Sequence, residues 1–384
     1  MTASPDSVWR SDRACAIRPP SLMHVGITAS MKVLLVGDVF GADRGDHFFM
    51  TKQKFLAGFV RNGHAVHVFN DRQEARYATI MHSRKFGRKP ANQALVETAR
   101  NFQPDLIFLG HCEIIGNDTL DEIRRLLPDV RIAYNNVDPI HDFKHDNHTR
   151  IMNRTNSVDA IFSTTAGEKL RKFAGGRAAV HHVPNPVDPS VEVLRQDEQP
   201  VDALPVDVFF AFMGRQSVRD PETGEDIRVA VATRLKERLL DVRFEVRGLD
   251  YPPVRGQRYM DAIARSRMGL NLSRISHHYL YSSDRMAHYA GCGLLTFVNR
   301  ATSFGELFGE DELAFYDDED ELAQRIQWFC ENDDARRRVA AAGRQRIHQL
   351  FNVSRLARYV SEATFGMPYT EDYEWPTEPA KPLT

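Results

Sequence analysis

The sequence predicts an α/β protein with two tandem domains, each built on a parallel sheet. At about 150 residues per domain, the 384 residues exceed a single module. Short apolar runs alternate with stretches of helical character, which is the pattern of right-handed βαβ units. The alternation stops at the Pro-rich passage 183–189 and then starts again.

The first domain is expected over residues 31–186. It opens with Met31-Lys-Val-Leu-Leu-Val-Gly-Asp38, a short apolar run that ends in Gly-Asp, as buried parallel strands do. Strands are expected at 33–36, 65–69, 105–109, 130–134 and 158–163, and helices at 48–62, 91–101 and 118–127. Residues 1–30 show no periodicity, so we expect a disordered extension, with Met31 as the natural start.

A linker is expected over residues 187–204, where the Pro-rich passage runs into a polar segment. The second domain is expected over 205–360. Its strands are predicted at 206–213, 242–246, 268–272 and 294–298, and its helices at 228–240, 258–266, 284–291, 319–331, 333–349 and 354–363. The end of the chain, 361–384, contains many Pro and Glu residues and is expected to pack back or to be disordered.

Composition excludes several classes of protein. Apolar residues make up 42% of the chain, which is enough for a sizeable core, and the formal net charge of -2 gives no global attraction for nucleic acid or an anionic membrane. Any such contact must be local. The four cysteines are scattered without a Cys-x-x-Cys pair, and no apolar run approaches membrane-spanning length. No secretory signal core is evident either, so a cytoplasmic location is expected.

Ligands of open parallel sheets bind at the carboxyl ends of the strands. The loops that follow the expected strands are therefore the places where functional residues are expected. They are 37–47, 110–113 and 135–139 in the first domain, and 214–215, 247–250 and 271–285 in the second.

The stretch 271–285 is the most informative of these loops. Ser283 or Asp284 can cap the helix that follows, and Gly291-Cys-Gly293 ends it before the next strand. Free N–H groups at a helix start, with Arg285 in the first turn, favour binding of a phosphate. His288 lies three residues further on the same face. The alternative is that Arg285 is a solvated charge and His288 a packed side chain.

Several motifs of the second half follow one another in an order that is typical of a known protein family. They are Arg285-Met-Ala-His-Tyr-Ala-Gly-Cys-Gly-Leu-Leu-Thr296, Phe304-Gly-Glu-Leu-Phe308, Phe315-Tyr-Asp-Asp318, Glu321-Leu322 and Ala342-Gly-Arg-Gln-Arg346 with 351–355. This order resembles the donor half of GT-B glycosyltransferases, and most closely the CgeB-like spore-protein branch. In the first half, Pro104-Asp-Leu-Ile-Phe and Asn136-Val-Asp-Pro139 are similar to the family's acceptor strands.

The resemblance covers roughly residues 31–360. It implies two Rossmann-like domains with a cleft between them, a nucleotide sugar held by the C-terminal domain, an acceptor held by the N-terminal domain, and no cofactor or metal. Retaining relatives carry glutamates at the position of His288 and near Leu280. Asp284, one helical turn before His288, is the expected substitute acceptor for the ribose hydroxyls; the alternative is that nucleotide recognition differs or is lost. By the same resemblance, Arg215 and Lys236 stand where a basic pair meets phosphate, although Lys236 equally suits a helix-face charge. Glu306 stands at an acidic loop position, or caps a helix.

The full set expected to bind the donor is Arg215, Lys236, Asn271, Ser273, Arg274, Ser283, Asp284, Arg285, His288 and Glu306.

His111 is the leading catalytic candidate in the first half, because a histidine after a central strand has a pKa suited to proton transfer. A packed histidine with a backbone partner is the alternative. Asp46 follows as a second catalytic candidate, and Asp138 as a third unless it only initiates a turn. We expect Gly41, His47 and Asn136 to contact the acceptor.

His141 and His145 are spaced i, i+4 on one helical face, as in some zinc sites. No glutamate accompanies them in a zincin pattern, so a polar rim around the acceptor is favoured and no metal is expected.

The sequence thus predicts a metal-independent glycosyltransferase that moves a sugar from a nucleotide sugar to a glycan, a lipid-linked or cell-envelope saccharide, or a small molecule. A nucleotide-sugar epimerase and a binding protein that has lost catalysis are the alternatives. A dinucleotide-dependent oxidoreductase is disfavoured because no Gly-x-Gly-x-x-Gly follows either first strand. No nucleic-acid partner is expected, and the oligomeric state stays open.

Overall fold

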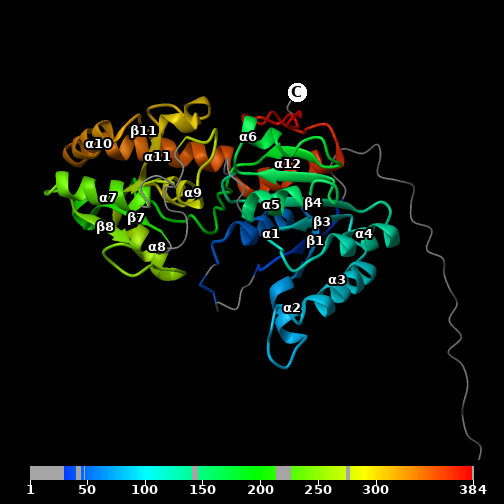
Figure 1. Ribbon diagram of the computed structural model, residues 1–384. Helices are drawn as coiled ribbons and strands as arrows, with labels where there is room; N and C mark the ends of the chain where they lie inside the picture. The colour runs from blue at the N-terminus through cyan, green and yellow to red at the C-terminus, as the bar shows by residue number, and fades with distance from the viewer. Residues whose placement is uncertain are drawn as a thin grey trace, which may run out of the picture.

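The computed structural model describes residues 30–39, 45–46, 48–140, 146–212, 226–273 and 277–382. Two α/β domains lie side by side, each with helices on both faces of its sheet (Figure 1). The first sheet has six strands in the order β2-β1-β3-β4-β5-β6, and the second has five in the order β11-β10-β9-β7-β8. Every neighbouring pair is parallel. The predicted fold class is confirmed. The expected extension 1–30 lies outside the described residues apart from Ser30.

The first domain follows the predicted alternation. Its strands are β1 Lys32–Val36, β2 Ala65–Phe69, β3 Leu106–Leu109, β4 Arg131–Asn136, β5 Ala160–Ser163 and β6 Ala179–His182, and its helices are α1 Thr51–Arg61, α2 Asp71–Tyr77, α3 Arg88–Phe102, α4 Asn117–Leu126, α5 Asp146–Met152 and α6 Glu168–Arg171. Three helices, α2, α5 and α6, and the edge strand β6 were not predicted. Each is at most seven residues long, which is too short for a clear hydrophobic period.

The second domain is equally regular. Its strands are β7 Val206–Ala211, β8 Phe244–Arg247, β9 Ser266–Leu270, β10 Leu295–Asn299 and β11 Ala314–Tyr316, and its helices are α7 Ile227–Arg238, α8 Gln257–Ala264, α9 Asp284–Gly291, α10 Glu319–Glu331, α11 Asp333–Leu350 and α12 Val353–Phe365. Short 3₁₀ turns occupy Val201–Ala203, Arg300–Thr302 and Phe304–Glu306. Only β11, with three residues, was missed among the strands.

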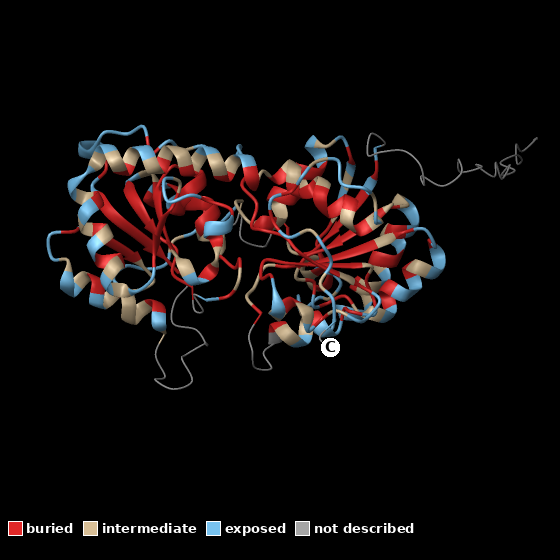
Figure 2. Cartoon of the chain, turned by 90° about the horizontal axis from the view of Figure 1, so that it is seen from above, coloured by how far each residue is buried: buried red, intermediate tan, exposed pale blue. Residues whose placement is uncertain are grey.

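Both sheets are buried on their two faces, apart from the edge strand β2, where Ala65 and His67 are exposed. The central strand β3 reads Leu-Ile-Phe-Leu with every residue buried, and β7 is likewise buried throughout. Figure 2 shows these strands as the buried interior of each domain, with the exposed residues on the outer sides of the helices and on loops. Such double coverage explains why the strands are continuous apolar runs. No helix in the described parts of the chain is long and apolar enough to cross a bilayer.

The end of the chain returns to the first domain. Helix α12 packs along α1, where Gly58 lets the backbones approach: a Cβ there would lie 2.6 Å from the Val353 carbonyl oxygen. The residues that follow bury Tyr373 and Trp375 against this domain, and the Ala380 N–H donates to Val180 of β6. The predicted domain boundary at residue 360 therefore falls inside a helix that packs on the first sheet.

A buried ionic contact joins both domains to the segment between them. The Lys54 ammonium of α1 lies 2.6 Å from Glu192 Oε1, and the same oxygen lies 2.7 Å from His288 Nδ1 of α9. None of the three residues is more than 2% exposed. Burial raises the pKa of Glu192, but the Lys54 charge and the His288 contact outweigh it and lower the pKa to about 2. We name these three residues the hinge triad.

The hinge triad gives a stability prediction. Glu192→Ala leaves the Lys54 charge buried without a counter-charge, which costs about 3–5 kcal/mol, and should lower the melting temperature by several degrees. The double variant Lys54→Met/Glu192→Gln removes both charges and should regain most of the loss. Thermal unfolding at neutral pH measures both. A double variant no more stable than Glu192→Ala would contradict the role of the pair.

The same contact predicts a dependence on pH. Because folding lowers the pKa of Glu192 from 4.5 to about 2, its contribution is complete above pH 4.5 and is lost as the pH falls toward 2. The melting temperature of the wild type should therefore fall more steeply over this range than that of the double variant.

Candidate functional site

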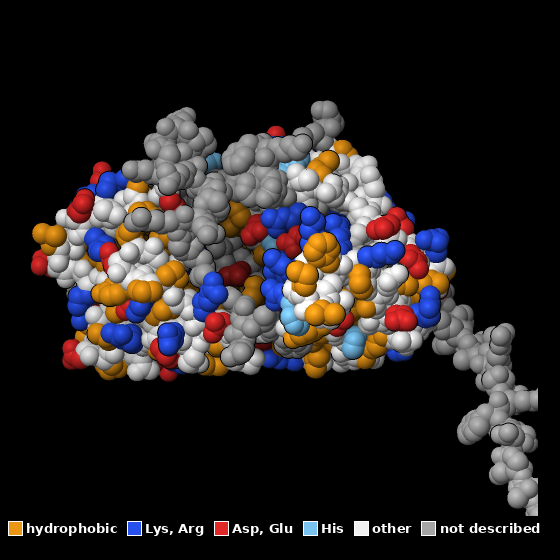
Figure 3. All heavy atoms as spheres, turned by 60° about the horizontal axis from the view of Figure 1, so that its bottom comes forward, with side chains coloured by type: hydrophobic (Ala, Val, Ile, Leu, Met, Phe, Trp, Pro, Cys, Tyr) orange, Lys and Arg blue, Asp and Glu red, His pale blue; other side chains and the backbone are white. Residues whose placement is uncertain are grey.

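The carboxyl edges of the two sheets meet across the junction of the domains. The Asp46 carbonyl, in the loop after β1, accepts a 2.7 Å hydrogen bond from the Gly256 N–H before α8. The Ala166 N–H after β5 donates to the Tyr279 carbonyl over 3.0 Å. The Thr51 hydroxyl reaches Asp284 at the start of α9. The surface is hollowed where the domains meet (Figure 3). Strand ends of both sheets thus face one another, as a shared site requires.

The first domain gathers charged side chains at this edge. They follow β2, β3 and β4 or come from helices beside them, and we name them the N-terminal charged cluster: Lys52, Asp71, Arg72, His111, Glu113, Asp138 and Arg150.

His111 and Asp138, which were predicted separately, come together in this cluster. His111 Nε2 lies 3.7 Å from Asp138 Oδ2, and this nitrogen is buried without a hydrogen-bond partner among the described residues. Burial lowers the pKa of His111 below its ordinary value despite the nearby Asp138 carboxylate. A neutral imidazole beside a carboxylate can accept a proton, and the carboxylate then stabilises the positive charge. The pair therefore has the composition of a general base with a supporting carboxylate.

Lys52 and Asp71 were not singled out in the sequence. Asp71 is fully buried, and burial raises its pKa to about 6 in spite of the Lys52 charge. Burial also lowers the pKa of Lys52, whose chain passes within van der Waals reach of Gly37 and Gly110. A Cβ on Gly110 would lie 2.5 Å from Lys52 Cε, so this glycine makes room for the lysine. Perturbed groups packed at a strand edge are typical of functional sites.

A cavity of about 290 Å³ opens beside the cluster. Its lining includes Glu113 and Arg150 of the cluster, together with Tyr134, Arg154 and Arg88. Arg154 is held by the carbonyls of Cys112 and Ile115, so its charge is fixed in the wall. The cavity therefore offers a polar, largely preformed pocket next to His111.

The other candidates of the first domain take different places. Asn136 is fully buried and donates to the Asp138 carbonyl over 2.7 Å, so it shapes the turn that carries Asp138 instead of facing a ligand. The side chain of Asp46 is exposed, and its backbone contacts the second domain. Gly41, His47 and the suggested metal pair His141 and His145 lie outside the described residues.

The second domain places Arg285 at the opposite edge as a partly buried cation. Its guanidinium donates to the Leu272 carbonyl and lies 5.3 Å from the centre of the Phe210 ring. Its Nε is buried without a hydrogen-bond partner, and no carboxylate of the described residues pairs with it. Burial lowers the pKa of Arg285, and the nearby charge of Arg228 lowers it further. Arg285 is therefore partly buried and held by these contacts, and is not a fully solvated charge.

Arg228 is a cation that sequence reasoning missed. It lies at the start of α7, 6% exposed, stacks over Phe212 at 4.9 Å, and is bound bidentately by Asp226. A basic residue two positions after the Asp226 cap could have been noticed as a first-turn cation. Asp226 offsets the charge of Arg228, so among the described residues at the carboxyl end of β7 the cation available to stabilise an anion is Arg285.

The start of α9 borders this cationic region. Ser283 is the N-cap residue, but its side chain makes no cap bond and donates instead to Asn271 over 3.4 Å. Asp284 accepts a hydrogen bond from Thr51. Ser273 is 9% exposed and Asn271 8% exposed at the end of β9. Four of the residues predicted to bind the nucleotide sugar thus lie together, two at the end of β9 and two at the start of α9.

Three side chains predicted to bind the nucleotide sugar are paired with other residues of the protein instead. His288 is 2% exposed and bound to Glu192, so a ribose contact by this side chain is replaced by the hinge triad. Lys236 pairs with Asp250 at 2.6 Å, which satisfies the charge expected to meet phosphate. Glu306 accepts a 2.5 Å hydrogen bond from the Tyr279 hydroxyl. Arg215 and Arg274 lie outside the described residues.

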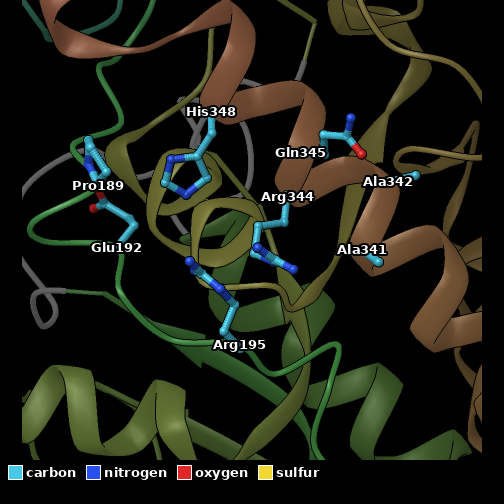
Figure 4. A pocket seen from close by; sticks show the side chains of 8 residues that line it. All are labelled: Pro189, Glu192, Arg195, Ala341, Ala342, Arg344, Gln345 and His348. Atoms are coloured by element: carbon cyan, nitrogen blue, oxygen red, sulfur yellow. The ribbon is translucent and has the colours of Figure 1, made fainter.

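A larger cavity, of about 560 Å³, lies behind the hinge between residues 189–195 and α11. Arg195, Arg344 and His348 line it together with Glu192 (Figure 4). Arg344 is neutralised by Asp197, and His348 contacts the Gly291 carbonyl over 2.9 Å. These groups hold the linker against α11, so the cavity belongs to the hinge.

Comparison with known proteins agrees with this arrangement. Residues 228–361 match the family model described as "Glycosyl transferase-like". A comparison with curated protein sequences gives no match. The CgeB-like branch is not resolved by these findings.

Solved structures with the same fold cover nearly the whole chain. Alr3699/HepE of Anabaena, in complex with UDP-glucose, superposes with a TM-score of 0.52 at 13% identity over 88% of this chain and all of that one. The β-glucosyltransferase of T4 phage gives 0.50 at 9% over 88% of this chain and 100% of that one. A structure described as trehalose-6-phosphate from E. coli, bound with UDP-2-fluoro glucose, gives 0.52 at 12% over 88% and 99%. The chain has the two-domain GT-B fold and carries a glycosyltransferase-like domain at residues 228–361.

Proposed function

We propose that the protein is a glycosyltransferase that uses a UDP-sugar. The observation that carries the proposal is the partly buried Arg285 at the carboxyl edge of the second sheet, whose Nε lacks a hydrogen-bond partner and which pairs with no carboxylate of the described residues. A buried cation without a counter-ion is costly unless an anion joins it, and a diphosphate supplies that anion. The free N–H groups at the start of α9 also favour the binding of a diphosphate.

The choice of UDP is supported by ligands of proteins with the same fold. Alr3699/HepE is described with UDP and glucose, and the E. coli protein with UDP-2-fluoro glucose. We therefore place the diphosphate at Arg285 and the ribose near Asp284 and Asn271. The family glutamate that His288 replaces is absent, and the nearby Glu192 carboxylate is fully buried, so Asp284 is the acceptor group left for the ribose hydroxyls.

The first domain supplies the acceptor side. In the reaction the bond between the anomeric carbon and the β-phosphate oxygen breaks, and the acceptor oxygen forms the new bond to that carbon. The acceptor proton passes to His111, whose charge Asp138 stabilises, and UDP leaves with its charge held by Arg285. The cavity beside Glu113 and Arg150 receives the acceptor. The junction of the domains excludes water from the reacting groups and so favours transfer over hydrolysis.

We also propose the family branch, the cellular location and a reaction without a metal. The order of motifs from 285 to 322 supports membership of the CgeB-like branch. The scattered cysteines, of which Cys112, Cys292 and Cys330 are free, support a reducing cytoplasmic location. The reaction needs no metal in this scheme, because arginines and a helix start neutralise the diphosphate.

Arg285 gives a test with opposite effects on binding and stability. The Arg285→Met variant should weaken UDP binding by roughly 10- to 100-fold, because a charge-assisted contact to phosphate is lost. The melting temperature of the unliganded variant should be unchanged or raised, since a buried unpaired charge is removed. Calorimetry with UDP and thermal unfolding measure the two effects.

The matched control for this test is Arg238→Met, which changes an exposed arginine of α7 paired with Asp320. It should bind UDP like the wild type. Normal UDP binding by Arg285→Met would overturn the donor site. A panel of GDP, dTDP, ADP and CMP in the same thermal assay identifies the nucleotide by its stabilising effect. Binding without transfer to any acceptor would indicate a homologue that has lost catalysis.

His111 gives a test of the chemistry. The His111→Gln variant should lower kcat by about 100- to 10,000-fold while UDP binding stays unchanged, because only proton transfer is removed. Since burial lowers the pKa of His111, the wild-type rate should fall only below pH 6.5, where the imidazole becomes protonated. The variant should lack this acid limb.

The control is His67→Gln, an exposed histidine on β2. It should keep the wild-type pH profile of the transfer rate. A His111→Gln enzyme with wild-type rate and profile would remove His111 from the mechanism.

A further inference from the structure

A basic, apolar projection joins α2 to α3, at the foot of the first domain (Figure 1). From residue 75 to residue 96 the sequence contains no Asp or Glu. The exposed apolar side chains of this segment and its basic ones without an ion pair in the described structure form what we name the α2–α3 patch: Tyr77, Ile80, Met81 and Phe86 with Arg76, Arg84, Lys85 and Lys89.

The apolar side chains of the patch are unusually exposed. Ile80 is fully exposed, Met81 is 80% exposed, and Tyr77 and Phe86 are 72% and 68% exposed. Figure 3 shows hydrophobic side chains on this face with Lys and Arg side chains beside them. Isolated exposed apolar residues need no explanation, but four within ten residues form a patch of the kind that marks an interaction surface.

The patch stands on an ordered base. A Cβ on Gly87 would lie 1.6 Å from the Ala75 carbonyl oxygen, so the two ends of the segment are in backbone contact. Between them the Ser83 N–H donates to the Thr79 hydroxyl over 2.9 Å, and the Gly87 N–H donates to the Ser83 carbonyl. The turn is therefore held by its own hydrogen bonds while its apolar side chains point away from the core.

We propose that the α2–α3 patch docks the protein on an anionic lipid bilayer. Basic residues near an anionic membrane are attracted to its surface, and apolar side chains between them can enter the headgroup region. Nucleic acid would match the basic residues but offers no apolar surface for Ile80 and Met81, the two aliphatic side chains that extend furthest. The net charge of -2 for the whole chain confines the attraction to this face.

The patch adjoins the candidate acceptor pocket. Arg88, two residues after Phe86, lines the 290 Å³ cavity and donates to the Ile114 carbonyl. Helix α2 begins at Asp71 and Arg72 of the N-terminal charged cluster and ends at Tyr77 in the patch. A bilayer bound at the patch would therefore be separated from the N-terminal charged cluster by only the seven residues of helix α2. Given the proposed function, which this step rests on, the acceptor is a saccharide carried on a membrane lipid.

The test is co-sedimentation of the full chain with vesicles. The wild type should bind vesicles of phosphatidylcholine with about 30 mol% phosphatidylglycerol, should bind pure phosphatidylcholine much less, and should lose binding as salt rises. The variant Ile80→Ser/Met81→Ser/Phe86→Ser should bind anionic vesicles roughly 100-fold more weakly, and Arg84→Glu/Lys85→Glu at least about tenfold more weakly.

The matched control is Arg125→Glu/Leu126→Ser, which alters an exposed cation and an exposed leucine on α4 of the same domain. It should bind vesicles like the wild type. All variants should keep the wild-type melting temperature, because the altered side chains are exposed.

Wild-type failure to bind anionic vesicles, or patch variants that bind as well as the wild type, would overturn the proposal. Equal retention of the wild type and the apolar triple variant on heparin, without vesicle binding, would assign the patch to a soluble polyanion and overturn it as well.

Vesicle binding is measured without a nucleotide sugar, so it is independent of the proposed activity. Vesicle binding without a UDP-dependent thermal shift would leave the docking surface standing and overturn the proposed function. A thermal shift without vesicle binding would overturn the docking surface alone.

Discussion

The buried contact among Lys54, Glu192 and His288 constrains the rest of the molecule. It ties α1 of the first domain, the segment between the domains and α9 of the second domain to one carboxylate. Charges taken out of water at this depth are tolerated only when they are paired, so each domain fixes the position of the other. The start of α9 therefore meets the first domain at a defined place, and Arg285, one turn before His288, is positioned by the same contact that holds the hinge.

The facing edges of the two sheets differ in their charges, and each edge suits a different part of the reaction. The first domain carries cations and carboxylates interleaved around His111, which suits proton transfer to and from a neutral acceptor. In the second domain Arg285 pairs with no carboxylate of the residues that the structure describes, which suits a leaving group with two negative charges. A low-dielectric junction strengthens both effects.

The fold could be predicted because long strands and helices carry their own hydrophobic period. Helix 319–331 was predicted with the bounds that it has in α10, and 284–291 likewise in α9. Short elements such as β6 and α2 were missed, since their pattern depends on neighbours distant in sequence. For the site, loop position after a strand singled out His111, Asp138 and Arg285, but it could not show that His288 would meet Glu192, 96 residues away. Such pairing is decided by packing, which no local pattern encodes.

Helix α12 gives the chain an order of assembly. About 290 residues separate the end of α1 from the start of α12, and at roughly 5–20 residues per second the ribosome needs some 15–60 s to cross that distance. Throughout this time the face of α1 around Gly58 has no partner. The first domain to be synthesised is thus the last to be completed, and a chaperone that shields α1 during synthesis would act on the interval that the topology itself creates.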